Sequence, residues 1–496
     1  MTADVFGAAA LRHAVTEAWL GSGTRFREDA NAEEDHARGY YRDRVVTELA
    51  QNAADAAARA GAAGRLVLRL TELADDPRGV AVLVAANTGA PLTADGVASL
   101  ASLRASAKAA PEGDTPGGPG EVGRFGVGFA AVRAVSDEAT VRSTSGGVRF
   151  SLAATRDLLD DVAPEGSALR DAVAGRGDDL PVLRLPFPAP ALGEAPDGAD
   201  DGWDGFATVV ELVLRDADAV ASVRAQLDAV DDALLLALPA LASVTVECCE
   251  RDFGDYSVAN SPRNRAHSDD GGPTTRVLAD VDDRWEVLRR SGAVADDETA
   301  DLPLEQRRPR WSVAWAVPRD TAGTAGTADA ASVSGDASGD AVLHAPTPTD
   351  VPLTFPALLV ASFPVDPGRR RVLPGPLTDR LTAEAGRAYA DLLAGLAPER
   401  GADVLDLVPG GMPAGDLDAA VRDAALDALR SAPLLPAPAD ATSPGEDAGP
   451  VAARVAPADA TVLVGAAGDD PRLVGVLAGV VPGLVALTTA QQGVAR

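Results

Sequence analysis

The sequence is poor in cysteine and histidine, and this shortage excludes two common ways of stabilising a fold. Its 496 residues include 2 cysteines and 4 histidines. The cysteines, Cys248 and Cys249, are adjacent, which makes them a poor disulfide pair, and no Cys/His cluster has the spacing of a zinc site. These counts favour a reducing compartment, and we expect a cytoplasmic protein.

Aromatic residues and long apolar runs are also scarce. Aromatics make up 4% of the chain, so alanine, valine and leucine must fill its cores. The first fifteen residues, MTADVFGAAALRHAV, lack a cationic region followed by a long apolar run, and we therefore expect no signal peptide. The Val/Leu-rich run 472–487 contains glycine and proline and is too short to cross a bilayer. We expect a soluble protein without a membrane partner.

Positive charge is in short supply. The chain has 44 Lys+Arg against 74 Asp+Glu, a formal net charge of −30. This balance argues against a general nucleic-acid or anionic-membrane binder, because both need a positive field. Lys108 is the single lysine, all other basic side chains being arginine, which draws attention to its position.

The first part of the chain alternates helical patterns with short β-rich runs, which predicts an α+β fold in the form of a two-layer α/β sandwich. We expect helices at 40–61 and 96–106, and strands at 65–73, 79–87, 139–144, 147–152 and 208–214. A loose stretch at 109–121 precedes a glycine-rich run, 123–135, that becomes helical. The Pro/Gly/Asp-rich run 186–205 is typical of a surface loop.

We expect three domains from the length and from these patterns. They are 1–215, a smaller α/β middle domain at 216–398, and a mainly helical, Ala/Pro-rich region at 399–496. The middle domain would begin with a helix at 216–241 and contain β-like runs at 243–248, 311–317 and 353–363 and a helix at 377–397. Its polar insertions, about 260–275 and 321–340, have the composition of disordered segments.

Glu48, Asn52 and Asp55 are spaced i, i+4 and i+7 along the first strong helix. At about 100° per residue they share one helix face. A solvated face can contain the same residues by chance, but asparagine is a poor helix-interior residue unless its side chain has a task.

Two glycine-containing runs follow. Asn87-Thr88-Gly89-Ala90-Pro91 ends an apolar strand and is by itself an ordinary turn. Gly123 to Phe129 leads into a helix, where backbone N–H groups suit phosphate. It is not a P-loop, because no Gly-Lys-Ser/Thr follows, and it is not a Rossmann motif, because no strand directly precedes it.

In their order and spacing, these motifs resemble the GHKL (Bergerat-fold) ATPases. The runs 48–56, 104–108 and 123–129 look most like the branch that contains the ninety-kilodalton heat-shock chaperones and sacsin. The resemblance extends through the strand 207–212, and Arg25 to Asn31 is similar to the opening run of bacterial sacsin-type proteins. It covers about residues 20–215.

The resemblance implies an ATP site with Mg²⁺. Asn52 would hold the metal, and Glu48 would orient and deprotonate the attacking water. The nucleotide-binding residues that it implies are Asn52, Asp55, Ala56, Asn87, Gly89, Lys108, Gly123, Arg124, Phe125, Gly126, Val127, Gly128, Phe129 and Thr208. Chaperones of this class also use a basic residue of the middle domain to reach the γ-phosphate, and Arg370, within Arg369-Arg370-Arg371, is the candidate. A solvated basic turn is the alternative for that cluster.

Two positions depart from the family pattern. Relatives typically place an aspartate where Asn87 stands and a second glycine where Pro91 stands. Asparagine can still accept a hydrogen bond from the adenine amino group, but it carries no charge.

The sequence thus predicts an ATP-binding, slowly hydrolysing, chaperone-like protein whose nucleotide state regulates a protein client or partner. A nucleotide-responsive scaffold or signalling module that does not hydrolyse ATP is the alternative. A DNA-repair or topoisomerase-type ATPase fits poorly with the net charge of −30. The region after 399 lacks the pattern of a complete dimerisation module, so a homodimer would be weak or would need a partner.

Overall fold

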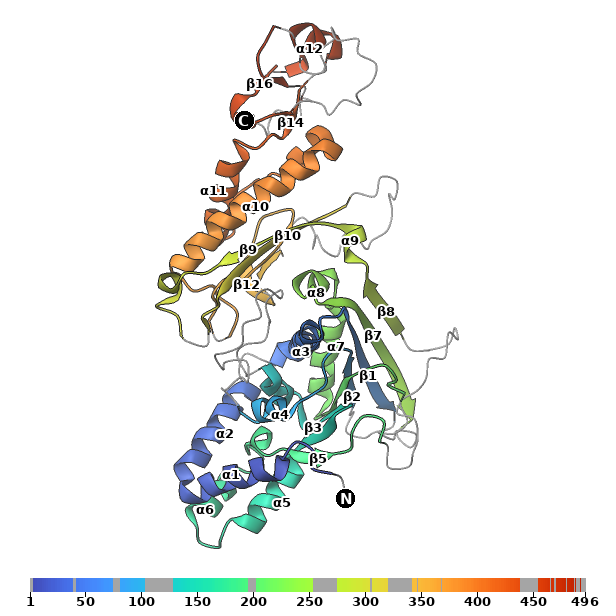
Figure 1. Ribbon diagram of the computed structural model, residues 1–496, viewed down its shortest axis with the longest axis vertical. Coiled ribbons are helices and arrows are strands. Elements are labelled where there is room, and N and C mark those ends of the chain that lie inside the picture. Colours follow the sequence, from blue (N-terminus) through green and yellow to red (C-terminus); the bar gives the residue numbers. More distant parts are fainter. Residues whose placement is uncertain are drawn as a thin grey trace. The chain divides into compact units, whose positions relative to one another are not determined.

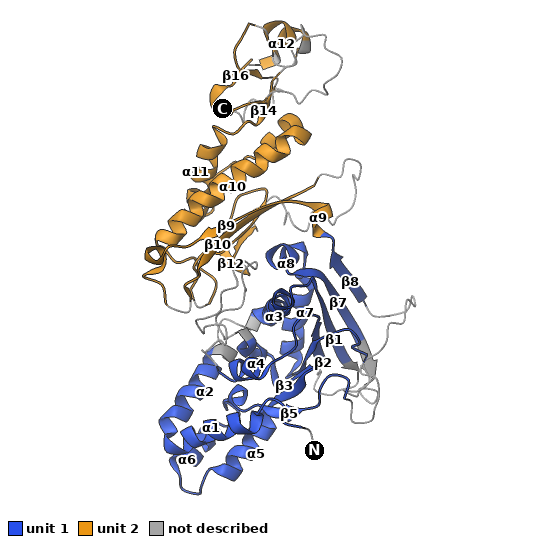
Figure 2. Cartoon of the chain, viewed as in Figure 1, with its two compact units in different colours: residues 1–280 blue, residues 281–496 orange. Residues whose placement is uncertain are grey.

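The computed structural model describes residues 3–38, 42–74, 81–102, 128–194, 202–252, 274–303, 306–319, 341–345, 347–366, 368–437 and parts of 454–491. The chain forms two compact units, 1–280 and 281–496 (Figure 2). The first unit extends past the expected boundary at 215, because β7 (Leu241–Asp252) and β8 (Thr274–Ala279) belong to its sheet. Apart from 274 and 275, which begin β8, the two insertions expected to be disordered lie outside the described residues.

An eight-stranded mixed sheet forms the centre of the first unit, in the order β5-β4-β3-β6-β2-β1-β7-β8 (Figure 1). β1 and β7 are parallel, and the other neighbours are antiparallel. The remaining strands are β1 (Gly64–Ala74), β2 (Ala81–Asn87), β3 (Ser136–Ser143), β4 (Gly146–Ser151), β5 (Phe187–Ala189) and β6 (Thr208–Leu214). A mixed α/β architecture is therefore confirmed.

Helices cover one face of this sheet. α3 packs on β1 so closely that a Cβ at Gly64 would lie 2.6 Å from the Ala57 Cβ, and the buried Leu66, Leu68 and Leu70 of β1 pack beneath the helices. The described helical segments of the unit are α1 (Ala8–Gly21), α2 (Gly23–Arg38), η1 (Arg42–Arg44), α3 (Val45–Ala60), α4 (Ala94–Leu100), η3 (Gly128–Ala134), α5 (Leu152–Val162), α6 (Ala168–Ala174), η4 (Val182–Arg184), α7 (Ala217–Asp228) and α8 (Asp232–Ala237).

Two expectations for this unit need correction. The run 186–205, expected to be a surface loop, contains the edge strand β5 and Trp203, which is buried over β2 and β6. Arg69 stacks on its indole at 4.6 Å. The single helix expected at 216–241 is divided into α7 and α8, because the Asp231 carboxylate accepts a hydrogen bond from the Ala233 N–H and starts a new helix.

The second unit combines a five-stranded sheet with a pair of packed helices. The sheet has the order β12-β11-β13-β10-β9, from β9 (Trp285–Ala293), β10 (Arg310–Pro318), β11 (Val342–His344), β12 (Pro348–Pro352) and β13 (Leu358–Ala361). α10 (Pro376–Arg400) lies on this sheet, where the Trp315 indole N–H donates to the Ala385 carbonyl at 2.9 Å. α11 (Asp416–Leu429) packs on α10, and Gly386 permits the close approach, since a Cβ there would lie 2.5 Å from the Ala424 carbonyl carbon.

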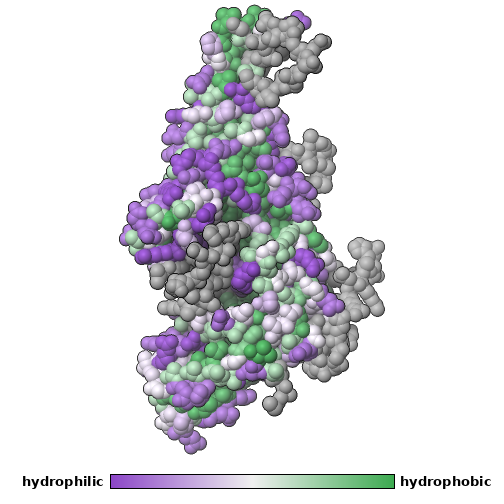
Figure 3. All heavy atoms as spheres, in the orientation of Figure 1, coloured by the Kyte–Doolittle hydropathy of each residue, from purple (hydrophilic) through white to green (hydrophobic). Residues whose placement is uncertain are grey.

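Short elements end the second unit. They are α12 (Pro471–Ala478) and two-stranded ladders made by β14 (Leu435–Pro436) with β15 (Arg454–Val455) and by β16 (Thr461–Val462) with β17 (Leu484–Val485). None of the helices in the described parts of the chain combines the length and the apolar character needed to cross a membrane. Polar and apolar residues are interspersed on the face of each unit that Figure 3 presents.

Candidate functional site

Helix α3 carries the three polar residues that the sequence places on one face. Glu48 and Asp55 are buried, at 3% and 1% exposure. Asn52, between them, is exposed, and it is the single exposed position in the run 48–57. The amide is therefore accessible on a helix that is otherwise enclosed along this run, one turn after a buried carboxylate.

The turn after β2 rests directly on this helix. The Ala90 N–H donates to the Ala56 carbonyl at 2.9 Å. Gly89 has φ = +120°, and a Cβ at this position would lie 2.6 Å from the Ala56 carbonyl carbon. Only glycine tolerates both the backbone angle and the contact. The structure thus brings Ala56 of the helix against Gly89 and Ala90 of the turn.

Asn87 is 8% exposed and its amide has a defined orientation. Its Nδ2 donates to the Thr88 carbonyl oxygen at 2.9 Å. Because a carbonyl oxygen only accepts, the nitrogen must face Thr88, and Oδ1 is directed elsewhere as an acceptor.

Ser143, at the end of β3, joins three segments of the site. Its hydroxyl donates to the Ala207 carbonyl at 2.7 Å and accepts from the Leu92 N–H at 3.0 Å. The Thr208 hydroxyl lies 3.1 Å from the Ser143 oxygen. Since the Ser143 proton is already used, Thr208 is the donor in that contact. Thr208 also pairs with Asn87 in the β2–β6 register, so the hydroxyl and the amide lie side by side where β2 ends and β6 begins.

The glycine-rich run is only partly described. Lys108, Gly123, Arg124, Phe125, Gly126 and Val127 lie outside the described residues. Gly128 begins η3, and Phe129 is buried with its ring 5.6 Å from that of Phe150. The helix expected after the glycines is therefore a 3-10 helix.

A buried charge network, which no sequence motif indicated, anchors η3 to α2 and β3. The Arg133 guanidinium donates to Glu33 at 2.9 Å and to Asp137 at 2.7 Å. Glu33 also accepts from the N–H groups of Val182 and Leu183 at 3.0 Å each. Burial raises the pKa of Glu33, although the charge of Arg133 and the hydrogen bonds from the two amides act to lower it. Although burial opposes it, hydrogen bonds from Arg215 and Arg133 lower the pKa of Asp137.

Arg370 belongs to the second unit, in the turn 366–371. Its N–H donates to the Asp366 carboxylate at 2.8 Å, and its guanidinium pairs with Asp350 at 3.3 Å. Arg369 is buried with φ = +53°. The alternative for this cluster is a solvated basic turn, which the buried Arg369 does not fit. A role of Arg370 in phosphate contact stays a prediction.

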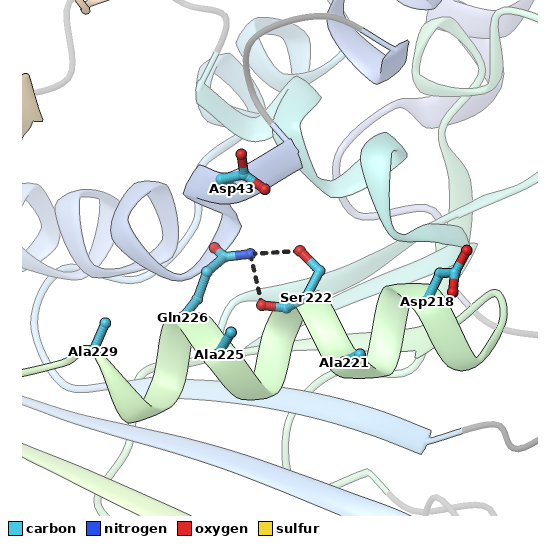
Figure 4. Close-up of a pocket in the computed structure, with 7 residues that line it drawn as sticks. All are labelled: Asp43, Asp218, Ala221, Ser222, Ala225, Gln226 and Ala229. Carbon is cyan, nitrogen blue, oxygen red and sulfur yellow. Dashed lines mark hydrogen bonds between the residues drawn. The ribbon is translucent and has the colours of Figure 1, made fainter. Parts of the chain in front are cut away.

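A pocket of about 570 Å³ lies beside the start of α3. Asp43 lines one side, and the opposite side is α7, from which Ser222 and Gln226 point into the space (Figure 4). The remaining lining residues are Asp218, Ala221, Ala225 and Ala229. Sequence motifs indicated neither this pocket nor its residues.

A scan of the sequence against models of protein families finds no match, and a search of curated proteins finds none with significant similarity.

Proposed function

We propose that the first unit is an ATP-binding domain of the GHKL (Bergerat) type, and that the chain is a chaperone-like cytoplasmic protein that slowly hydrolyses ATP. The observation that carries this proposal is the hydrogen bond from the Ala90 N–H to the Ala56 carbonyl. It brings the N-x-G turn against the helix with Glu48, Asn52 and Asp55, which is the combination of motifs on which the resemblance rests. The eight-stranded mixed sheet with helices on one face is compatible with this fold type.

The exposure of Asn52 suits the proposed chemistry. The accessible amide oxygen of Asn52 is a hard ligand of the kind that Mg²⁺ uses, and Mg²⁺ keeps several waters and substrate phosphates as its other ligands. Among the described residues, no group of three or more Asp, Glu, His or Cys is arranged to hold a metal ion. When bound, the metal would neutralise phosphate charge.

The remaining roles fall to residues of this chain. Glu48 would orient and deprotonate the attacking water, a contribution commonly worth about 10²- to 10⁴-fold in rate. The Asn87 Oδ1 would accept a hydrogen bond from the adenine amino group, since its Nδ2 is engaged by Thr88. Asp55 and Ala56, both buried, would contribute to the nucleotide site.

Titration calorimetry with Mg²⁺ and either ATP or GTP tests the proposal. We expect adenine-selective binding that is lost in Asn52→Ala. Arg59→Ala, an exposed change on the same helix, is the matched control and should bind as wild type does. Absence of heat with both nucleotides up to millimolar concentration, or unchanged binding by Asn52→Ala, would refute an ATP site at α3.

Glu48→Ala distinguishes the enzyme from the nucleotide-responsive scaffold. If the chain hydrolyses ATP, this variant should keep binding and lose turnover by at least about 100-fold. The scaffold is favoured instead if wild type binds ATP but releases as little phosphate as Glu48→Ala does. Asn87, which lacks the charge of the family aspartate, is the observation that keeps this second function open.

A further inference from the structure

Helix α3 begins without a cap of its own. Its N-cap residue, Arg44, makes no side-chain cap hydrogen bond. The first N–H groups of a helix have no partner within the helix and need one elsewhere. Here the Gln226 Oε1, from α7, accepts from the Val46 N–H at 3.1 Å. Residues 180 positions apart thus share the start of the helix that carries Glu48.

The orientation of the Gln226 amide is fixed from both ends. Its Nε2 lies 3.3 Å from the Ser222 carbonyl oxygen and 3.3 Å from the Ser222 hydroxyl (Figure 4). The Val46 N–H can only donate, and the Ser222 carbonyl can only accept. Both contacts therefore require the same assignment of oxygen and nitrogen, and a flipped amide would lose both.

A pocket lies beside the hydrogen bond that joins Gln226 to the Val46 N–H. It is lined by Asp43 of η1 on one side and by α7 on the other. The volume of this pocket is about 570 Å³, and η1 and α7 also contact each other directly. Gln226 lines this pocket and joins α7 to the first turn of α3 through its hydrogen bond with the Val46 N–H.

From this geometry we propose that Gln226 is a positioning residue for the ATPase reaction, acting through the first turn of α3 to hold Glu48 in place. The inference rests on the proposed function. Val46 lies two residues before Glu48, so a shift of the capped turn moves the carboxylate relative to the attacking water. Displacements of about 1 Å at a reacting group can cost up to 10²-fold in rate.

Two variants of similar size separate positioning from simple stabilisation. Gln226→Met keeps the length and removes the acceptor, while Gln226→Glu keeps an acceptor for the Val46 N–H. At a temperature well below unfolding, we expect Gln226→Met to lower kcat about tenfold with an unchanged ATP Kd from calorimetry. We expect Gln226→Glu, which keeps the acceptor for the Val46 N–H but loses the Nε2 contacts with Ser222, to retain more of the wild-type kcat than Gln226→Met does. Hydrogen exchange at the Val46 amide should quicken in the Met variant and not in the Glu variant.

The outcomes distinguish this inference from the proposed function. Suppose that wild type hydrolyses ATP and that Gln226→Met either keeps its kcat or shows a lower melting temperature as its sole change. The positioning role of Gln226 would then be wrong, and the proposed ATPase activity would stand. A parallel loss of affinity and kcat would also overturn it. Wild type that neither binds nor hydrolyses ATP would overturn both proposals.

Discussion

At the scale of single residues, Gly89 determines whether the turn after β2 can rest on α3. Its φ is +120°, and a Cβ would lie 2.6 Å from the Ala56 carbonyl carbon and 2.7 Å from the Ala57 nitrogen. We expect Gly89→Ala to lower the free energy of unfolding by about 2–4 kcal/mol, from backbone strain and the contact together. It should also weaken ATP binding at least tenfold. Urea unfolding and calorimetry measure the two effects.

Gly61→Ala provides the comparison. Gly61 has φ = +62° at the end of α3, and a Cβ there would meet no atom within 4 Å. It therefore reports the cost of a positive φ alone, about 1–2 kcal/mol. A Gly89→Ala loss no larger than this would contradict the close-approach argument.

The predictability of the site also differs from residue to residue. Glu48, Asn52 and Asp55 could be grouped from the sequence because helical periodicity relates them. Ser143 could not be found, because its contacts with Ala207 and Leu92 join residues 64 and 51 positions away and no local pattern encodes them. The exposure of Asn52 could not be predicted either, because it depends on how α3 packs against the rest of the unit and not on the spacing of residues along the helix.

At the scale of elements, Arg133 ties η3 to α2 and β3. We expect Arg133→Leu to destabilise the first unit by about 3–5 kcal/mol, because Glu33 would remain buried without its cation. Adding Glu33→Gln should recover part of that loss, since the neutral amide no longer needs a charge partner. Urea denaturation of the single and double variants measures the coupling. Losses that simply add would contradict a buried pair.

The elements that the sequence predicted well are those with strong local patterns. α3, β1, β2 and β6 begin and end within a few residues of expectation, apart from the first turn of the helix, because their apolar residues follow a clear period. β8 escaped prediction, since four of its six residues are exposed and show no alternation. The break between α7 and α8 depends on the side chain of Asp231, which a helical pattern does not reveal.

At the scale of the whole molecule, the parallel pairing of β1 with β7 sets the smallest segment that can fold. We expect the fragment 1–280 to fold and to bind ATP as the full chain does. The fragment 1–215 would lack β7 and β8, leaving β1 paired with β2 on one side and unpaired on the other. It should aggregate or lack a cooperative unfolding transition by circular dichroism. Cooperative unfolding of 1–215 would contradict this.

The same strand pair has a consequence for the nascent chain. Arg69 and Glu247 are neighbours across β1 and β7, yet 178 residues separate them. At about 5–20 residues per second of synthesis, β1 waits roughly 10–40 s before its partner leaves the ribosome. During that interval β1 can pair with β2, but the backbone groups on the side that β7 later covers form an unpaired strand edge, which is a site for aggregation. The β1–β7 pairing therefore requires that this strand edge avoid other chains until residues 241–252 have been made.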